Sequence, residues 1–149
     1  MGKTLEELYG LEKHEVELHR IETKSGKWLE VFKAPGKVLV RVEFPEFTCL
    51  CPKTSQPDFA TIILCYIPRD WCIELKALKY YLNSFRSEGH FHEEVCCLME
   101  RDLRKVLDPI KLAIIGKFNV RGGIYPTIFV GDDIGSMDLV RPTQSVMWD

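Results

Sequence analysis

Cys51 and Asp58 lie seven positions apart in a polar segment that reads Cys-Pro-Lys-Thr-Ser-Gln-Pro-Asp. A thiolate is a strong nucleophile, and a nearby carboxylic acid can protonate the group that the thiolate attacks. The segment lies between two strand-like runs, and a loop held by rigid strands can expose both groups together. An ordinary cysteine has a pKa near ~8.5, and Lys53 could raise the thiolate fraction of Cys51. The alternatives are a buried structural thiol and a turn-capping aspartate, and capping is the more usual role for an isolated Asp58.

Glu93 follows His92 at the start of a predicted helix. A guanine-like ring presents a ring N–H beside an exocyclic amine, and one carboxylate can accept both hydrogen bonds. Glu93 is therefore a candidate for recognising a purine-like edge. The alternative is a glutamate that stabilises a first helical turn through the helix dipole.

Three basic residues are candidates for binding phosphate. Lys76 and Lys79 lie three positions apart on a predicted helix, where their charges are neighbours. Arg121 precedes Gly122 and Gly123, and glycines let backbone N–H groups approach a phosphate that the arginine binds. The alternatives are a solvated basic helix face and an ordinary hairpin turn. The chain has no Gly-x-Gly-x-x-Gly segment, so a doubly wound dinucleotide-binding domain is not indicated.

Cysteine and histidine pairs raise the alternative of a metal site. Cys49 with Cys51 and His90 with His92 are each separated by one residue. Structural zinc sites usually show two Cys-x-x-Cys pairs, so we predict no metal. Three other thiols have no role that the sequence assigns: Cys49, Cys96 and Cys97.

The order of the predicted elements is strand, strand, helix, helix, strand, strand. Alternating or continuous apolar runs predict the strands, and apolar residues at helical spacing predict the helices. Pro45 is expected to end the first strand. A weak hairpin is expected before these elements, with its turn at residues 24–27. The hairpin is expected at residues 17–32. The four strands are expected at 38–44, 59–67, 112–118 and 127–130, and the two helices at 75–85 and 92–107.

This order predicts an α+β fold, with a four-stranded antiparallel sheet carrying both helices on one face. Such a sheet has two open edges, which invite pairing with other subunits. The chain length of 149 residues is most simply one domain, 1–149, with 1–15 and 135–149 as loose arms.

Composition excludes several classes of protein. The net charge of −2 argues against broad electrostatic binding to nucleic acid. The chain has no apolar run long enough for a membrane span, and its acidic N-terminus does not resemble a signal peptide. Six cysteines in a chain of ordinary composition are expected to be reduced thiols, which favours a cytoplasmic protein.

Residues 51–58, together with the run from Glu74 to Tyr81, resemble the short, single-domain branch of the NADPH-dependent 7-cyano-7-deazaguanine reductases. The resemblance covers residues 32–130. It implies the tunnelling fold, in which subunits close into a ring-shaped barrel with sites between neighbours. It also implies reduction of a nitrile to an amine on the route to the queuosine base of tRNA, acting on a small deazapurine rather than on nucleic acid.

The resemblance also implies roles for individual residues. Cys51 would attack the nitrile to form a thioimide, and Asp58 would supply the proton. NADPH would be the cofactor, and no metal would be required. Leu75 stands where many relatives carry serine, so only its backbone contact can be expected. The implied substrate-binding residues are Ile73, Glu74, Leu75, His92 and Glu93, and the implied cofactor-binding residues are Lys76, Lys79, Arg121 and Gly122.

Two other functions remain open at this point. A pterin- or GTP-processing enzyme of the same fold, such as a cyclohydrolase, would need zinc ligands and no NADPH. A non-catalytic purine-binding oligomer would still bind its ligand after Cys51→Ala and would consume no NADPH.

Overall fold

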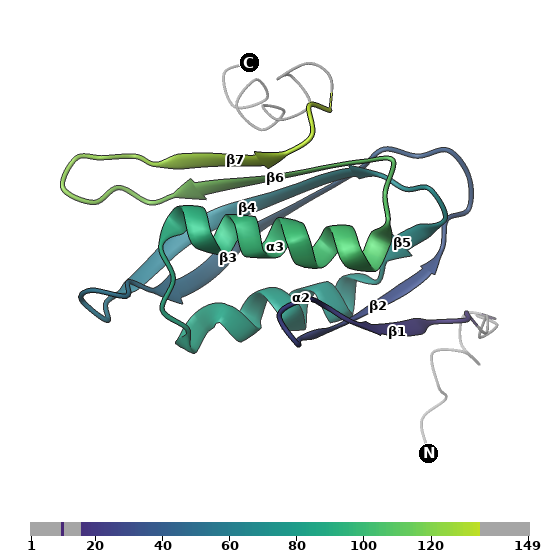
Figure 1. Ribbon diagram of the computed structural model, residues 1–149, viewed down its shortest axis with the longest axis horizontal. Helices are drawn as coiled ribbons and strands as arrows, with labels where there is room; N and C mark the ends of the chain where they lie inside the picture. Colours follow the sequence, from purple (N-terminus) through teal and green to yellow (C-terminus); the bar gives the residue numbers. More distant parts are fainter. Residues whose placement is uncertain (1–9, 11–15, 135–149) are drawn as a thin grey trace.

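The computed structural model describes residue 10 and residues 16–134, so most of both predicted arms lies outside the described residues. Figure 1 shows the elements along the chain. In order they are β1 (His19–Glu22), β2 (Trp28–Lys33), β3 (Val40–Leu50), β4 (Pro57–Ile67), β5 (Trp71–Ile73), α2 (Leu75–Asn83), the 3₁₀ helix η1 (Ser84–Ser87), α3 (His92–Leu107), β6 (Lys111–Phe118) and β7 (Thr127–Gly131).

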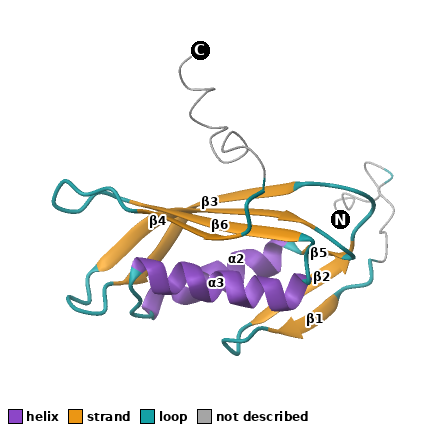
Figure 2. Cartoon of the chain, turned by 45° about the horizontal axis from the view of Figure 1, so that its top comes forward, coloured by secondary structure: helices purple, strands orange, loops and turns teal. Residues whose placement is uncertain are grey.

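The main sheet has the strand order β3-β4-β6-β7, and every neighbouring pair is antiparallel. Helices α2 and α3 lie side by side against one face of this sheet (Figures 1 and 2). The predicted α+β architecture, with a four-stranded sheet and two helices on one face, is therefore confirmed. β3 and β7 are the two edges of this sheet, and an edge position suits Pro126, which directly precedes β7.

The core forms between the sheet and the helices because each contributes an apolar face. Alternate residues of β4 point at the helices, and apolar side chains at helical spacing on α2 and α3 pack against them. The inward residues of β4 include Ala60, Ile62, Leu64 and Tyr66, and the helices contribute Leu78, Tyr81, Leu82, Val95, Met99 and Leu103.

A second, smaller sheet has the order β1-β2-β5. The predicted hairpin at residues 17–32 corresponds to β1 and β2, which pair around the turn at 24–27. β5 was not predicted, because three residues are too few to show a period of two. β5 pairs with β2, and this pairing places Ile73 and the start of α2 beside the small sheet.

Pro45 does not end β3, and this prediction was wrong. The strand continues to Leu50, and its register against β4 shifts between Phe44 and Phe47. A proline is tolerated there because β3 is an edge strand and the register shift forms a bulge. The extra length carries the chain to Cys51, and β4 likewise begins at Pro57, earlier than predicted.

The helix bounds follow local signals. α3 spans His92–Leu107 as predicted, and Asp108 takes the left-handed conformation (φ 41°) before Pro109. α2 ends at Asn83 rather than at residue 85, because the chain tightens into η1. Glu74 caps α2, since its carboxylate accepts hydrogen bonds from the backbone N–H groups of Lys76 (2.9 Å) and Ala77 (2.6 Å).

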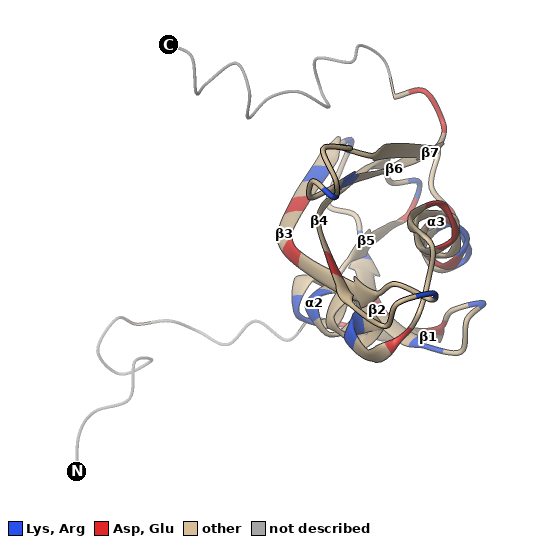
Figure 3. Ribbon diagram, turned by 90° about the vertical axis from the view of Figure 1, so that its left-hand side faces the viewer, with Lys and Arg blue, Asp and Glu red and all other residues tan. Residues whose placement is uncertain are grey.

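Charged residues are spread over the described part of the molecule. Figure 3 shows basic and acidic positions interleaved on α3 and along β3, rather than one basic face. No helix among the described residues is long and apolar enough to cross a bilayer.

Candidate active site

The Cys51 loop is a tight connection between β3 and β4. The backbone N–H of Cys51 donates to Gln56 (2.8 Å), and the N–H of Ser55 donates back to the carbonyl of Cys51 (2.9 Å). Ser55 has φ 58°, a left-handed conformation that closes the turn. These bonds fix the backbone around a half-buried thiol.

The loop stabilises the thiolate of Cys51. The Thr54 hydroxyl, followed by the backbone N–H groups of Thr54 and Lys53, lowers the pKa of Cys51 by hydrogen bonding to the sulfur. The negative charge of Asp58 acts in the opposite direction but is weaker. The sequence suggested the ammonium group of Lys53 as the activator. The structure instead assigns this role to the hydroxyl and the amides.

Asp58 is buried, at 4% exposure, on the helix-facing side of β4. It lies opposite Cys49 in the register of β3 and β4. Its Oδ1 has no well-aligned hydrogen-bond donor among the described residues, but it lies 2.5 Å from Nε of Arg121. Its Oδ2 lies 3.3 Å from Nε2 of His92. Asp58 is therefore held between two basic groups.

His92 opens α3 and faces Asp58. Its ring stacks on Phe118 of β6, with ring centroids 3.7 Å apart and an interplanar angle of 11°. This stacking fixes the plane of the imidazole and aims Nε2 at the carboxylate. Glu93, the next residue, is exposed at the same end of the helix. The structure thus brings His92 and Glu93 to the Cys51 and Asp58 end of the sheet.

Arg121 reaches Asp58 from the hairpin that joins β6 and β7. Arg121 and Ile124 exchange two backbone hydrogen bonds (3.0 and 2.9 Å), and Gly122 and Gly123 supply the positive φ angles (55° and 81°) that the turn needs. The guanidinium also donates to the carbonyl of Pro57 (2.5 Å). The side chain of Arg121 is 45% exposed, so it remains open to a ligand.

The other predicted residues lie elsewhere. Ile73, Glu74 and Leu75 line a cavity of about 370 Å³ together with Phe32, Val40, Tyr66 and Cys72. The N–H of Ile73 donates to the Tyr66 hydroxyl (2.9 Å), and Leu75 is 61% exposed at the rim. Lys76 and Lys79 are exposed on the first turns of α2.

These two groups of residues occupy opposite ends of the same strands. Val40, in the cavity, begins β3, whereas Leu50, next to Cys51, ends it. An eleven-residue strand is about 35 Å long. Figure 1 shows the β3–β4 loop at one end and the junction of β5 with α2 at the other. One chain therefore does not bring the Glu74–Lys79 segment to Cys51.

Two features of the site were missed from the sequence. Thr54 was not singled out, although a hydroxyl three positions after a loop cysteine is well placed to bond its sulfur. The pairing of His92 with Asp58 depends on tertiary structure, and local sequence carries no signal for it.

The remaining thiols near the site are less reactive. Burial, then the charges of Asp58 and Cys51, raise the pKa of Cys49 to about 11. Burial also raises the pKa of Cys96 to about 12. No group of three His, Cys, Asp or Glu side chains in the described part of the chain is arranged to hold a metal ion.

Comparison with known proteins identifies the class to which this fold and site belong. The model of the family described as QueF-like protein matches residues 57–134. This range runs from the start of β4 to the end of the described residues, and it includes Asp58. The chain belongs to the QueF-like family.

Within that family, the chain belongs with the NADPH-dependent 7-cyano-7-deazaguanine reductases, which confirms the resemblance carried by its motifs. The reductase of Thiobacillus denitrificans is 52% identical over 105 residues, covering 68% of this chain and 76% of the relative. The reductase of Thioalkalivibrio sulfidiphilus is 48% identical over 111 residues, covering 72% and 86%.

A solved structure supports the fold independently. The apo crystal structure of an archaeosine synthase, QueF-Like, superposes with a TM-score of 0.59 and covers 70% of this chain and all of that protein. Its sequence identity is 18%, so the likeness concerns the fold alone.

Proposed function

We propose that this chain reduces the nitrile of 7-cyano-7-deazaguanine to an aminomethyl group at the expense of NADPH. The observation that carries the proposal is Cys51, a thiol with a lowered pKa in a rigid loop that ends at the buried carboxyl of Asp58. The curated relatives at about 50% identity are named for this reaction.

Cys51 starts the reaction. Its sulfur bonds to the nitrile carbon, one C–N π bond breaks, and the nitrogen takes a proton from Asp58 to give a thioimide. Bound NADPH supplies hydride, two per nitrile, as the change in oxidation state requires. After the first reduction the C–S bond breaks, so Cys51 leaves as thiolate and an imine remains for the second. Closure of the pocket by a neighbouring copy would keep water from this imine.

Arg121 links the acid to the cofactor. Its guanidinium pairs with Asp58 and is also the group proposed to bind a cofactor phosphate, with Gly122 giving the backbone room to approach. No atom of the described residues lies within 4 Å of a Cβ built on Gly122 or Gly123, so the turn is open to this part of the chain. When Arg121 turns toward a phosphate, Asp58 loses a cationic neighbour.

Two copies of the chain would complete each site. Glu93 would accept hydrogen bonds from the deazaguanine edge at the Cys51 end, and His92 would orient the ring and Asp58. Ile73, Glu74 and Leu75 of a neighbouring copy would close the pocket, with Leu75 acting through its backbone. Lys76 and Lys79 of that copy would meet the cofactor phosphates. The ring-shaped tunnelling assembly would bring these two ends together.

The remaining assignments follow from this function. The substrate is a free deazapurine precursor, so no direct contact with tRNA or with a membrane is needed. The whole chain, 1–149, would act as one domain in the cytoplasm, where NADPH and reduced thiols are present.

The test is the consumption of NADPH with the cyano substrate, followed by absorbance. We expect two NADPH per substrate, and a covalent adduct on Cys51 by mass spectrometry when NADPH is withheld. Cys51→Ala should abolish both signals, whereas Cys97→Ala, which removes an exposed thiol on α3, should retain them. Consumption of one NADPH or none, or an adduct that persists in Cys51→Ala, would contradict the proposal.

A further inference from the structure

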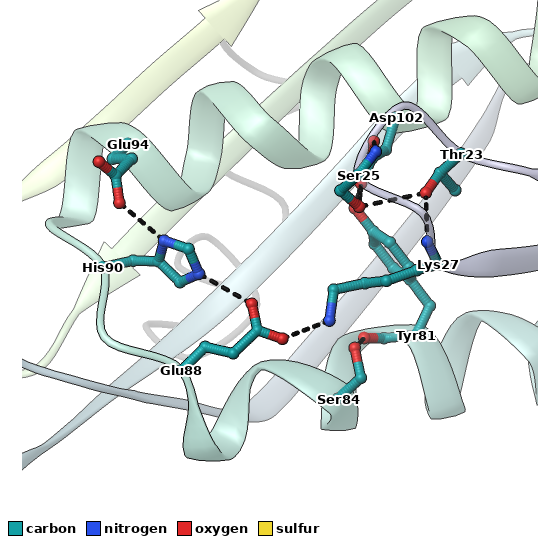
Figure 4. A network of polar contacts seen from close by, with 9 residues as sticks. All are labelled: Thr23, Ser25, Lys27, Tyr81, Ser84, Glu88, His90, Glu94 and Asp102. Atoms are coloured by element: carbon teal, nitrogen blue, oxygen red, sulfur yellow. Dashed lines mark hydrogen bonds and ion pairs between the residues drawn. The ribbon is translucent and has the colours of Figure 1, made fainter.

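Four charged side chains form a continuous chain of contacts beside the active-site loop (Figure 4). Lys27, in the turn between β1 and β2, donates to Glu88. Nε2 of His90 lies 3.0 Å from the other oxygen of Glu88, and Nδ1 lies 2.7 Å from Glu94 in the first turn of α3. The side chain of His90 is only 14% exposed. His90 therefore joins the loop after η1 to the start of α3.

The backbone of the same segment is paired with the end of β3. The N–H of Leu50 donates to the carbonyl of Glu88 (2.9 Å), and the N–H of His90 donates to the carbonyl of Leu50 (3.0 Å). A Cβ built on Gly89 would lie 3.5 Å from Cα of Pro52, so the segment also contacts the loop itself. Leu50 immediately precedes Cys51, and His92 and Glu93 immediately follow this segment. Residues 88–91 are thus the connection between the nucleophile and the substrate-recognition residues.

The protonated form of His90 suits this position. Burial alone would lower the pKa of His90, but the hydrogen bonds and charges of Glu88 and Glu94 outweigh it and raise the pKa. A protonated ring has two N–H donors and satisfies both carboxylates, whereas a neutral ring has one donor and must release one of them. The titratable groups that face His90 are Glu88 and Glu94. Lys27 lies on the far side of Glu88, with its ammonium group above the ring of Phe85. The ring of Phe85 contacts His90 edge-on.

We propose that His90 is a positioning residue for the nitrile reduction: as a clamp between Glu88 and Glu94, it fixes residues 88–93 against the end of β3 and thereby sets Glu93 relative to Cys51. The inference rests on the proposed function, because it concerns how the same site is assembled. His90 touches neither substrate nor reacting atoms in this scheme.

The sign of the pH dependence follows from the clamp. A raised pKa means that the clamp is complete below the ordinary pKa of histidine, about 6.5, and is lost as pH rises through the higher value in the folded protein. Loss of the clamp should loosen Glu93 more than it changes the chemistry of Cys51. The KM for the cyano substrate should therefore rise with pH across this range, with a smaller change in kcat.

The experiment compares two variants over the pH range from about 6 to 9. His90→Phe keeps a ring but has no donors, so we expect the KM at low pH to rise roughly three- to tenfold and to lose this pH dependence. His90→Arg keeps a permanent charge that can bind both carboxylates, so its KM should stay close to the wild-type low-pH value and also be flat with pH. His19→Phe is the matched control, because His19 pairs with Glu17 at the edge of the small sheet, and its profile should follow the wild type.

A second readout is independent of turnover. The amides of Leu50 and His90 should exchange with solvent faster in His90→Phe than in His90→Arg at the same pH. A wild-type KM profile in His90→Phe, or equal losses in both variants, would overturn the clamp. If the wild-type protein consumes no NADPH, the proposed function fails, and the exchange comparison still decides whether His90 holds residues 88–93.

Discussion

The sulfur of Cys51 meets one side-chain hydroxyl and two backbone N–H groups, all from the next three residues. Such donors stabilise a thiolate without a permanent positive charge beside it. A permanent positive charge at this place would also attract the anionic cofactor. At the scale of the residue, the activation of Cys51 is therefore a property of loop geometry.

Thr54→Val should make Cys51 less reactive at neutral pH, because the variant keeps the shape of the side chain but loses its hydroxyl. We expect the alkylation rate of Cys51 by iodoacetamide to fall several-fold at neutral pH and its midpoint to move to higher pH. Lys53→Ala keeps the backbone N–H and should leave the midpoint near that of the wild type. A midpoint that moves in Lys53→Ala but not in Thr54→Val would assign the activation to the ammonium group.

The sequence predicted that Cys51 and Asp58 are neighbours because only six residues separate them. The structure places Cys51 in the loop after β3 and Asp58 as the second residue of β4. The sequence also placed His92 and Glu93 at a helix start, where the structure finds them. The contact of Arg121 with Asp58 could not be predicted, since it joins residues 63 positions apart through the pairing of β4 with β6. Local sequence carries no information about that pairing.

Asp102 connects elements that are far apart in the sequence. Its buried carboxylate on α3 accepts hydrogen bonds from the N–H (2.8 Å) and hydroxyl (2.6 Å) of Ser25, and from the hydroxyl of Tyr81 on α2 (2.8 Å). Figure 4 shows these groups beside Thr23 at the turn of the β1–β2 hairpin. The small sheet is thereby held to both helices by a polar contact, in addition to the apolar core to which β2 contributes Leu29 and Val31.

Asp102→Ala should lower the free energy of unfolding by about 3 kcal/mol, because it leaves the buried Tyr81 hydroxyl and the Ser25 N–H without an acceptor. Tyr81→Phe removes one donor together with its own need for a partner and should cost about 1 kcal/mol. Chemical denaturation measures both. Asp70→Ala, at an exposed position, is the control and should change stability by less than about 0.5 kcal/mol. Equal losses in Asp102→Ala and Asp70→Ala would contradict this role.

Elements with a clear apolar pattern were predictable, and segments whose structure is imposed by strand pairing were not. The end of α3 follows from Pro109, because a proline disfavours helical conformation in the residue before it, and the strands of the main sheet follow from apolar runs. β5 and the second half of β3 escaped prediction because their structure is imposed by pairing with β2 and β4. The proline signal predicted the end of α3 correctly. It predicted the end of β3 wrongly at Pro45, because a proline in an edge strand does not remove a hydrogen bond of the sheet.

At the scale of the whole molecule, the candidate residues divide into a Cys51 end and a Glu74 end of the same sheet. If two copies complete each site, inactive variants of opposite ends should complement each other. Cys51→Ala and the double variant Lys76→Glu, Lys79→Glu should each be inactive alone. Unfolding and refolding them together should restore activity to about one quarter of the wild-type sites, because random mixing pairs intact halves at that frequency.

The control is Cys51→Ala mixed with Asp58→Asn, two variants of the same end, which should restore no activity. Activity in this control would place Cys51 and Asp58 of one site in different copies. No activity in the first mixture, despite an assembly of several chains by native mass spectrometry, would place the whole site in one copy.

The displaced register between Phe44 and Phe47 divides the outer edge of β3 into two short rows of backbone donors and acceptors, with Pro45 between them. An incoming strand that slides along this edge would meet a break in the ladder at every alignment except one that respects it. The irregularity at Pro45 would therefore discourage open-ended strand pairing, and it would favour a single alignment for any strand of a neighbouring molecule that paired with this edge.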